Sequence, residues 1–254
     1  MKFTYKAYRD LLALLQEQGY ALRSYHDYKG APRCAILRHD IDNSLERAVE
    51  LAELEAEGGA RSTYFVLLRT DFYNPASKRS LRALRRILAL GHEIGLHFDE
   101  ASYDPPLGSE QVDRQIIQEA KLLSELLEVP VSSVSMHRPS KATLEADYNI
   151  PGIVNSYGST FFHGFKYLSD SRCHWREPVE DIILSGRYDR LHILTHAIWY
   201  HEDEKDIVKT VGKFIRSASQ ERYLQMAENI KNIDEIFGGG DPLGDICRET
   251  GGIV

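Results

Sequence analysis

Apolar side chains follow two different periods along the chain, and these periods predict strands and helices in turn. Short apolar runs that are rich in β-branched and aromatic residues are typical of buried strands. Longer segments whose apolar residues recur every three or four positions are typical of amphipathic helices. The strand runs lie at 20–25, 34–37, 62–68, 93–97, 131–136, 166–168 and 191–195, and the helical segments lie at 3–18, 43–57, 77–90, 110–127, 178–185 and 204–237.

This alternation of strands and helices predicts an α/β fold built from parallel βαβ units with right-handed crossovers. About six to eight strands fit a barrel better than a long open sheet, and 254 residues are enough for one such barrel. We therefore expect a single domain over residues 1–254, with its core at 34–200, a long helix at 204–237 and a loose tail at 238–254.

The strand run at 34–37 ends abruptly in charged residues. Successive side chains of a strand point to opposite faces, so Asp40 and Asp42 project from the same side, roughly 6.5 Å apart, while His39 points behind the strand. A metal ion, a shared proton or nearby arginines must offset the repulsion between the two carboxylates. Alternatively, one aspartate caps the next helix and the other pairs with a surface arginine. Asn43 is the predicted N-cap of that helix.

Several other predicted strands also end in polar side chains. The carboxyl ends of parallel strands meet at one rim, where ligands bind in barrels and open sheets alike. A single histidine in such a place is more often structural, but the joint placement favours an active site. Imidazole and carboxylate groups together suit a zinc-like ion that keeps an open position for water. The residues at these strand ends are His97 with Asp99, His137 with Arg138, Asp170, and His196.

Composition limits the location and the partners. The formal charge is −7, and Lys and Arg are spread along the chain, which argues against nucleic acid. No apolar run approaches the roughly 20 residues that span a bilayer, and the first residues do not have the pattern of a signal peptide. Cys34, Cys173 and Cys247 are odd in number and far apart, as expected of thiols in a reducing compartment. These features predict a soluble cytoplasmic protein without membrane insertion.

Four motifs in this order resemble the NodB-type polysaccharide deacetylases, carbohydrate esterase family 4. They are Asp-x-Asp at 40–42, Gly-His-Glu-Ile-Gly-Leu-His at 91–97, Arg-Pro at 138–139 and Leu-Thr-His at 194–196. The resemblance runs from about residue 34 to residue 200. It implies a distorted (β/α) barrel of about seven parallel strands and a metal-dependent hydrolase that removes N- or O-acetyl groups from sugars.

The resemblance also implies a role for each matching residue. Asp40 is similar to the catalytic base, Asp42 and His97 to metal ligands, Arg138 to the arginine that holds the base, and His196 to the catalytic acid.

Asp170, which stands ahead of Trp175, is similar to the acidic and tryptophan motif that supports the site and would steer the catalytic histidine. Candidates for contact with the sugar are aromatic residues near the motifs, although a single aromatic in such a place more often has a packing role. The backbone N–H near Pro139 and Ser140 is the candidate oxyanion donor. These substrate-binding candidates are Tyr103, Ser140, Trp175, Trp199 and Tyr200.

The chain departs from the family pattern at one metal position. The family has a second metal histidine four residues after the first, and this chain has Ala101 there. Either His137 or Asp99 supplies the third ligand, or water completes the shell, or the metal site is lost. We favour His137, because it ends a strand adjacent to that of His97.

The leading hypothesis is a cytoplasmic deacetylase acting on an acetylated amino sugar or a small glycoconjugate made for a surface polysaccharide. Zinc is the expected metal, with cobalt, nickel or manganese as alternatives. A second hypothesis is a non-catalytic saccharide-binding or scaffold protein, and Ala101 is its main support. A third is another metal hydrolase such as a phosphoesterase, which needs a more cationic pocket than Arg138 alone supplies. The oligomeric state stays open.

Overall fold

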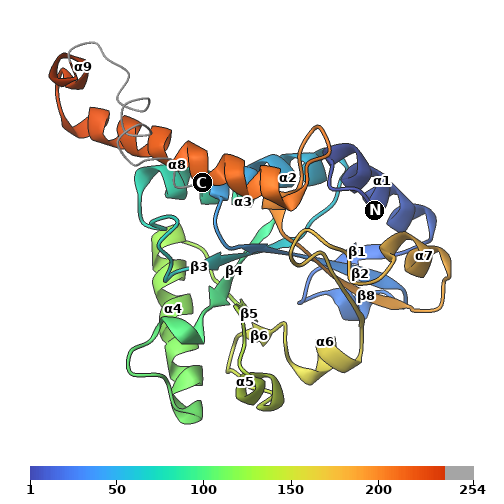
Figure 1. Ribbon diagram of the computed structural model, residues 1–254. Coiled ribbons are helices and arrows are strands. Elements are labelled where there is room, and N and C mark those ends of the chain that lie inside the picture. The colour runs from blue at the N-terminus through green and yellow to red at the C-terminus, as the bar shows by residue number, and fades with distance from the viewer. Residues whose placement is uncertain (238–254) are drawn as a thin grey trace. The chain divides into compact units, whose positions relative to one another are not determined.

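All the strands of the sheet are parallel, as the sequence predicts. A computed structural model describes residues 1–237, except for the side chains of residues 109 and 234. The chain forms two compact units, the first at 1–204 and the second from residue 205 on. In the first unit the strand order is β6-β5-β4-β3-β2-β8-β7, and β1 pairs with β2 outside this path (Figure 1). The strands are β1 (Ala21–Arg23), β2 (Cys34–Ile41), β3 (Thr63–Leu67), β4 (Glu93–Phe98), β5 (Ser133–Met136), β6 (Val154–Asn155), β7 (Lys166–Ser169) and β8 (Arg190–Thr195).

Helices follow most of the strands, and the longer ones cover the outer face of the curled sheet. They are α1 (Tyr5–Glu17), α2 (Leu45–Glu57), α3 (Lys78–Ala89), α4 (Ser109–Leu127), α5 (Lys141–Glu145), α6 (Ser159–His163) and α7 (Val179–Leu184), with short 3₁₀ turns at Tyr28–Gly30, Glu100–Ser102 and Ala197–Trp199.

The sheet curls into an incomplete barrel. Seven strands form its path, and among the described residues no pairing joins the two end strands, β6 and β7. The prediction of a distorted α/β barrel of about seven parallel strands is therefore confirmed. The predicted strand at 166–168 is also present, as β7.

Strand β2 divides the core into two clusters because all eight of its residues are buried. Ala35 and Leu37 point outward and pack with the residues of α1 and α2 in the main core. Cys34 and Ile36 point into the barrel, where they pack with Phe65 and with tyrosine and phenylalanine side chains. By the same alternation, Arg38 and Asp40 also lie on the inner face, near the carboxyl end of the strand.

The helix after β2 begins one residue later than predicted. The N-cap is Ser44, whose hydroxyl accepts a hydrogen bond from the Arg47 N–H at 3.3 Å. Asn43 lies in the bend that leaves the strand. Both residue types cap helices well, so the pattern alone did not separate them.

The second unit contains α8 (Ile207–Asn229) and α9 (Ile233–Ile236). Helix α8 is continuous through its serine-rich part, where the Ser217 hydroxyl donates to the Phe214 carbonyl at 2.8 Å. The helix ends at Asn229, before Asn232 adopts a left-handed backbone conformation. The predicted tail at 238–254 lies outside the described residues. Within 1–237 no helix combines the length and the apolar character needed to cross a membrane.

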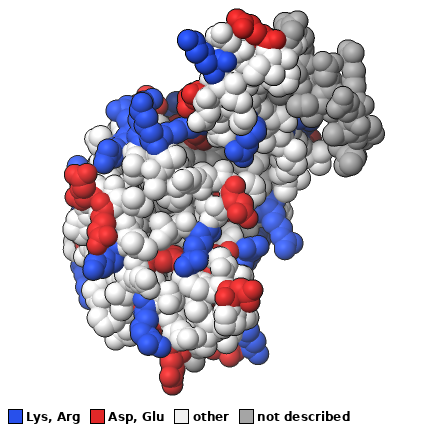
Figure 2. Space-filling view, turned by 90° about the vertical axis from the view of Figure 1, so that its left-hand side faces the viewer, with Lys and Arg blue, Asp and Glu red and all other residues white. Residues whose placement is uncertain are grey.

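Charges of both signs are mixed over the surface, as expected from the sequence. Figure 2 shows Lys and Arg side chains lying close to Asp and Glu side chains over much of one face. Ion pairs between neighbouring helices account for part of this pattern. Arg79 pairs with Glu46 at 2.7 Å, and Arg86 pairs with Glu53 at 2.9 Å, which links α3 to α2.

A buried carboxylate stabilises the layer between the sheet and the helices. Glu55 of α2 accepts hydrogen bonds from Tyr8 at 2.7 Å and from Tyr64 at 2.8 Å, and it pairs with His39 at 2.8 Å. Burial raises the pKa of Glu55, but His39 and the neighbouring His92 outweigh it and lower the pKa from 4.5 to about 2. The predicted packing of His39 behind its strand is thus confirmed.

Stability should fall in acid because of Glu55. A carboxyl whose pKa is depressed on folding contributes stability above its unfolded pKa, and the contribution is lost as the pH falls through its folded pKa. Between pH 4.5 and about 2 we expect the free energy of unfolding to drop by roughly 3 kcal/mol through this group. Urea titrations across this range measure it. The variant Glu55→Gln should be less stable at neutral pH and should show a weaker acid dependence, whereas the exposed control Glu57→Gln should behave as the wild type. An equal acid dependence in Glu55→Gln would contradict the assignment.

Gly95 of β4 should not tolerate a side chain. A Cβ atom there would lie 2.5 Å from the ring of Phe65 and 3.1 Å from the carbonyl of Ser133. We expect Gly95→Ala to lower the free energy of unfolding by about 1–3 kcal/mol, because the ring on the neighbouring strand must move. The control is Gly30→Ala, where a Cβ would meet nothing within 4 Å. Thermal or urea unfolding compares the two, and equal stabilities would show that the interior accommodates the methyl group.

Candidate functional site

The polar residues predicted at the strand ends surround one pocket. It has a volume of about 350 Å³ and lies at the carboxyl ends of β2, β4, β5 and β8. Its lining residues are Asp40, Asp42, His97, Met136, His137, Arg138, Pro139, Leu144, Tyr157, Phe162, Tyr167, Ser171, Arg176, Leu194 and His196.

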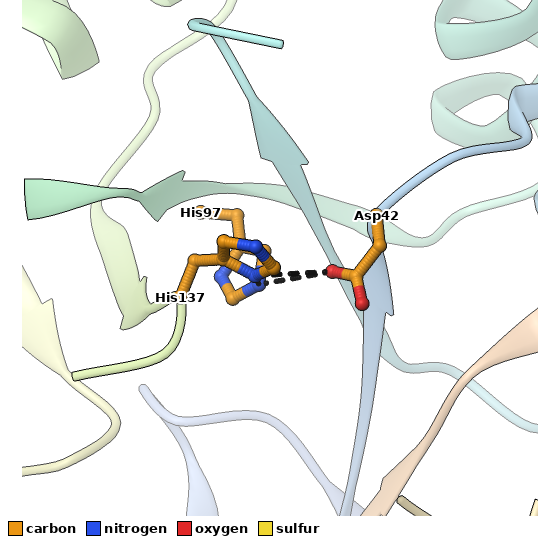
Figure 3. A group of neighbouring side chains, drawn as sticks. All are labelled: Asp42, His97 and His137. Atoms are coloured by element: carbon orange, nitrogen blue, oxygen red, sulfur yellow. Dashed lines mark hydrogen bonds and ion pairs between the residues drawn. The ribbon is translucent and has the colours of Figure 1, made fainter. Parts of the chain in front are cut away.

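Asp42, His97 and His137 form a compact group of possible metal ligands, here called the metal triad (Figure 3). The Oδ1 atom of Asp42 lies 3.3 Å from Nε2 of His97 and 3.4 Å from Nδ1 of His137, and the two ring nitrogens are 3.1 Å apart. The three residues come from the ends of β2, β4 and β5. The three atoms therefore form a nearly equilateral triangle.

The dimensions of this triangle fit a divalent ion. Ligand atoms about 2.0–2.1 Å from a tetrahedral zinc ion are separated by about 3.3–3.4 Å, close to the spacings seen here. The Oδ1 atom of Asp42 is buried, and it faces the ring nitrogens of His97 and His137. A buried carboxylate oxygen facing two imidazole nitrogens is a donor set suited to zinc and related metals.

Hydrogen bonds to neighbouring backbone groups orient the side chains in and around the metal triad. Nδ1 of His97 lies 3.3 Å from the carbonyl oxygen of Ser135, so this nitrogen carries the proton and leaves Nε2 as the ligand atom. Ala101 lies in the turn after β4, where its N–H donates to Asp99. Asp99 is thereby directed away from the metal triad, and His137 occupies the third place.

Asp40 is held by a neighbour on its own strand. Nε and Nη2 of Arg38 donate to the two carboxylate oxygens of Asp40 at 2.9 and 2.7 Å, and both side chains are at most 5% exposed. Burial alone would raise the pKa of Asp40, but Arg38 and then His97 outweigh it and lower the pKa. Nε2 of His97 lies 3.6 Å from Asp40, which places the carboxylate directly beside the metal triad.

The expected contact between Arg138 and Asp40 is absent. Arg138 is 70% exposed, and its Nη2 donates to Asp99 at 2.9 Å. Arg38 makes the contact that the resemblance had implied for Arg138. The sequence could have indicated this contact, because Arg38 and Asp40 are two residues apart on one strand and therefore project from the same face.

His196 and Asp170 form the second polar pair of the pocket. Nδ1 of His196 lies 2.7 Å from the fully buried carboxylate of Asp170, which also accepts the backbone N–H of His196 at 3.1 Å. Burial lowers the pKa of His196, but Asp170 outweighs it and raises the pKa to about 9. Nε2 of the same ring lies 3.9 Å from Asp42, so the protonated edge faces the metal triad.

The predicted substrate-binding residues do not line this pocket. Tyr103 donates to Glu119, Trp175 is 8% exposed in the main core and Tyr200 is fully buried. The Trp199 ring packs 6.5 Å from the ring of His196 but is not among the lining residues. Ser140 is the N-cap of α5, and its backbone N–H donates to Glu100, so it is not the expected oxyanion donor.

Three aromatic residues that sequence reasoning missed form one side of the pocket. The ring of Phe162 stacks on those of Tyr157 and Tyr167, with centroids 6.1 and 6.4 Å apart and interplanar angles of 30° and 21°. We call these residues the aromatic wall. Tyr157 and Phe162 lie between β6 and β7, in a segment without a clear period, where only the density of aromatic residues gave a signal, and Tyr167 lies in β7. Phe162 is 46% exposed and presents its ring to the pocket.

Comparisons with known proteins find similarity in structure only. No protein-family model matches the chain, and no curated protein matches it. A polysaccharide deacetylase from Bacillus cereus is similar at 14% identity over 74% of this chain and 88% of its own, with a TM-score of 0.45. A chitin deacetylase from the fungal pathogen Colletotrichum lindemuthianum is similar at 16% identity over 72% of this chain and 81% of its own, with a TM-score of 0.45.

A pseudoenzyme of carbohydrate esterase family 4 from Bacillus anthracis is also similar, at 13% identity over 75% of this chain and 63% of its own, with a TM-score of 0.42. Enzymes and a pseudoenzyme thus stand side by side among the structures that this chain resembles.

Metal binding should depend on His137 and not on Asp99. We expect His137→Ala to weaken zinc binding by more than about 100-fold, because one of three protein ligands is lost. Asp99→Asn should bind zinc within a few-fold of the wild type, since its side chain contacts Arg138 and the backbone. Titration of metal-free protein with zinc measures both. Loss of zinc in Asp99→Asn with retention in His137→Ala would reverse the assignment.

Proposed function

We propose that this protein is a metal-dependent hydrolase that removes an N- or O-acetyl group from a sugar or a saccharide precursor. One observation carries the proposal: a metal triad, a carboxylate held ionised by an arginine and a histidine paired with a buried aspartate all face one pocket. A hydrolase of this type needs a Lewis acid, a base and an acid around one carbonyl group.

The metal triad would hold the ion through Asp42, His97 and His137. A bound divalent ion supplies Lewis acidity toward a carbonyl oxygen and toward water. Zinc is the proposed metal because a site with two imidazole ligands and one carboxylate leaves a position open, as in catalytic zinc sites.

Asp40 would act as the general base. Two hydrogen bonds from Arg38 occupy the carboxylate and keep it ionised, and its Oδ2 atom faces His97. As a water molecule adds to the acetyl carbonyl carbon, Asp40 takes the proton that the water gives up.

His196 would act as the general acid. Asp170 accepts the Nδ1 proton, which fixes the ring and directs Nε2 toward the pocket. When the bond between the carbonyl carbon and the sugar nitrogen or oxygen breaks, Nε2 gives its proton to the leaving atom. The products are acetate and a free amine or hydroxyl group.

The aromatic wall supports a sugar as the substrate, since exposed ring faces in a pocket pack against the apolar faces of pyranose rings. We further propose that the substrate is an intracellular precursor of a surface polysaccharide and that the chain works as one cytoplasmic domain. The odd number of cysteines and the complete burial of Cys34 in the barrel agree with a reducing compartment.

A phosphoesterase is the second candidate, and one observation favours it. The pocket is lined by Arg176 as well as Arg138, so it is more cationic than the sequence indicated. Assays with acetylated sugar phosphates distinguish the two reactions, because one releases acetate and the other releases phosphate.

The two aspartates should have separable roles. We expect Asp40→Asn to bind zinc nearly as the wild type but to lower kcat for acetate release by about 10²–10⁴-fold, because the base is lost. Asp42→Asn should lose zinc and activity together. The exposed control Asp71→Asn should change neither quantity.

Zinc titration and acetate release from acetylated amino sugars, measured on each variant, give the comparison. Loss of zinc in Asp40→Asn with retention in Asp42→Asn would reverse the two roles. A wild-type protein that binds zinc and stays folded but releases no acetate from any acetylated sugar would contradict the function itself.

A further inference from the structure

Two guanidinium groups line the pocket in addition to the residues of the proposed reaction. Arg138 is 70% exposed and uses one nitrogen for its bond to Asp99. Arg176 is exposed as well, and none of the ion pairs among residues 1–237 includes it. Both groups therefore keep N–H donors available at the pocket.

These arginines do not neutralise the carboxylates of the pocket, which have partners already. Asp40 is paired with Arg38, and Asp42 lies against His97 and His137. The chain as a whole carries a formal charge of −7, so composition does not explain two additional arginines in one small pocket. An anionic group on the ligand is the charge that would complement them.

The other lining residues define where the neutral part of such a ligand would lie. Phe162 and Leu144 are 46% and 42% exposed, although both are large apolar side chains. A sugar ring that packs on the aromatic wall would cover this apolar surface. Its acetyl group would point to the metal triad, and an acidic substituent would reach the arginines.

Given the deacetylase function proposed above, we propose that the pocket selects an acetylated sugar that carries an acidic group, which Arg138 and Arg176 bind while the sugar ring packs on Phe162. The planar guanidinium fork matches carboxylate and phosphate oxygens equally well. The shared chemistry is an oxyanion, and its two possible sources are a uronic acid carboxylate and a sugar phosphate.

Three ligands test this inference on the zinc-loaded, full-length protein. They are N-acetylglucosamine, its 1-phosphate and the corresponding N-acetylated amino uronic acid, which share the acetyl group and differ in charge. Calorimetry measures binding, and acetate and phosphate assays measure turnover. We expect at least one acidic ligand to bind about tenfold or more tightly than the neutral sugar, and we expect added salt to weaken only the acidic ligands. The acidic ligand that binds more tightly identifies the source of the oxyanion.

The variant Arg176→Gln should reduce this preference by about tenfold and should leave the affinity for N-acetylglucosamine within about twofold. Arg172→Gln is the matched control, because Arg172 is an exposed arginine of the same loop that does not line the pocket. Phe162→Ala should weaken neutral and acidic ligands equally. Equal binding of all three ligands, or an equal effect of Arg172→Gln and Arg176→Gln, would overturn the inference.

Failure of this inference and failure of the proposed function give different results. Acetate release without any preference for acidic sugars would agree with the proposed deacetylase function but would overturn the proposed anion site. If an acidic sugar binds tightly, and if this binding depends on Arg176 but no acetate is released, the anion site is supported and the deacetylase function is overturned. Release of phosphate in place of acetate would overturn the deacetylase in favour of a phosphoesterase.

Discussion

The buried ion pair between Arg38 and Asp40 is the interaction on which the site depends. Both side chains project into the barrel from the central strand β2, where water cannot screen their charges. A buried charge is tolerated only with a partner and further hydrogen bonds, and Arg38 also donates to the hydroxyl oxygens of Ser135 and Tyr157. This pair joins β2 to β5 and to the aromatic wall. It thereby fixes the carboxylate next to the metal triad.

The strand ends could be predicted from the sequence because they depend on local patterns. Apolar runs that stop at Asp40, His97, His137 and His196 mark the carboxyl ends of parallel strands, and such ends must meet at one rim. The choice of His137 over Asp99 followed from the same reasoning, and the structure places His137 in the metal triad. For these residues, the pattern of apolar and polar positions and the topology of the fold lead to the same prediction.

Other parts of the site depend on contacts that no local pattern specifies. Arg138 stands at a strand end and matches the family motif, but a left-handed backbone turn at this residue directs its side chain to Asp99. Trp175 and Tyr200 stand close to the motifs but are buried in the core. Tyr157 and Phe162 of the aromatic wall come from a segment between β6 and β7 with no regular period, so the stacking of their rings with Tyr167 of β7 is visible only in the three-dimensional structure.

The open side of the barrel, between β6 and β7, affects which parts of the sequence can vary during evolution. The metal triad and Asp40 stand on or directly after β2, β4 and β5, which are paired through the continuous hydrogen-bonded part of the sheet. Tyr157 and Phe162 of the aromatic wall belong to the stretch between β6 and β7, the two strands that do not pair with each other among the described residues. Substitutions and insertions around Phe162 need not disturb the strand pairing from β2 to β5 that holds these residues. In this barrel, the surface that a ligand meets can vary in one part of the chain while the arrangement of Asp40, Asp42, His97 and His137 is kept in another.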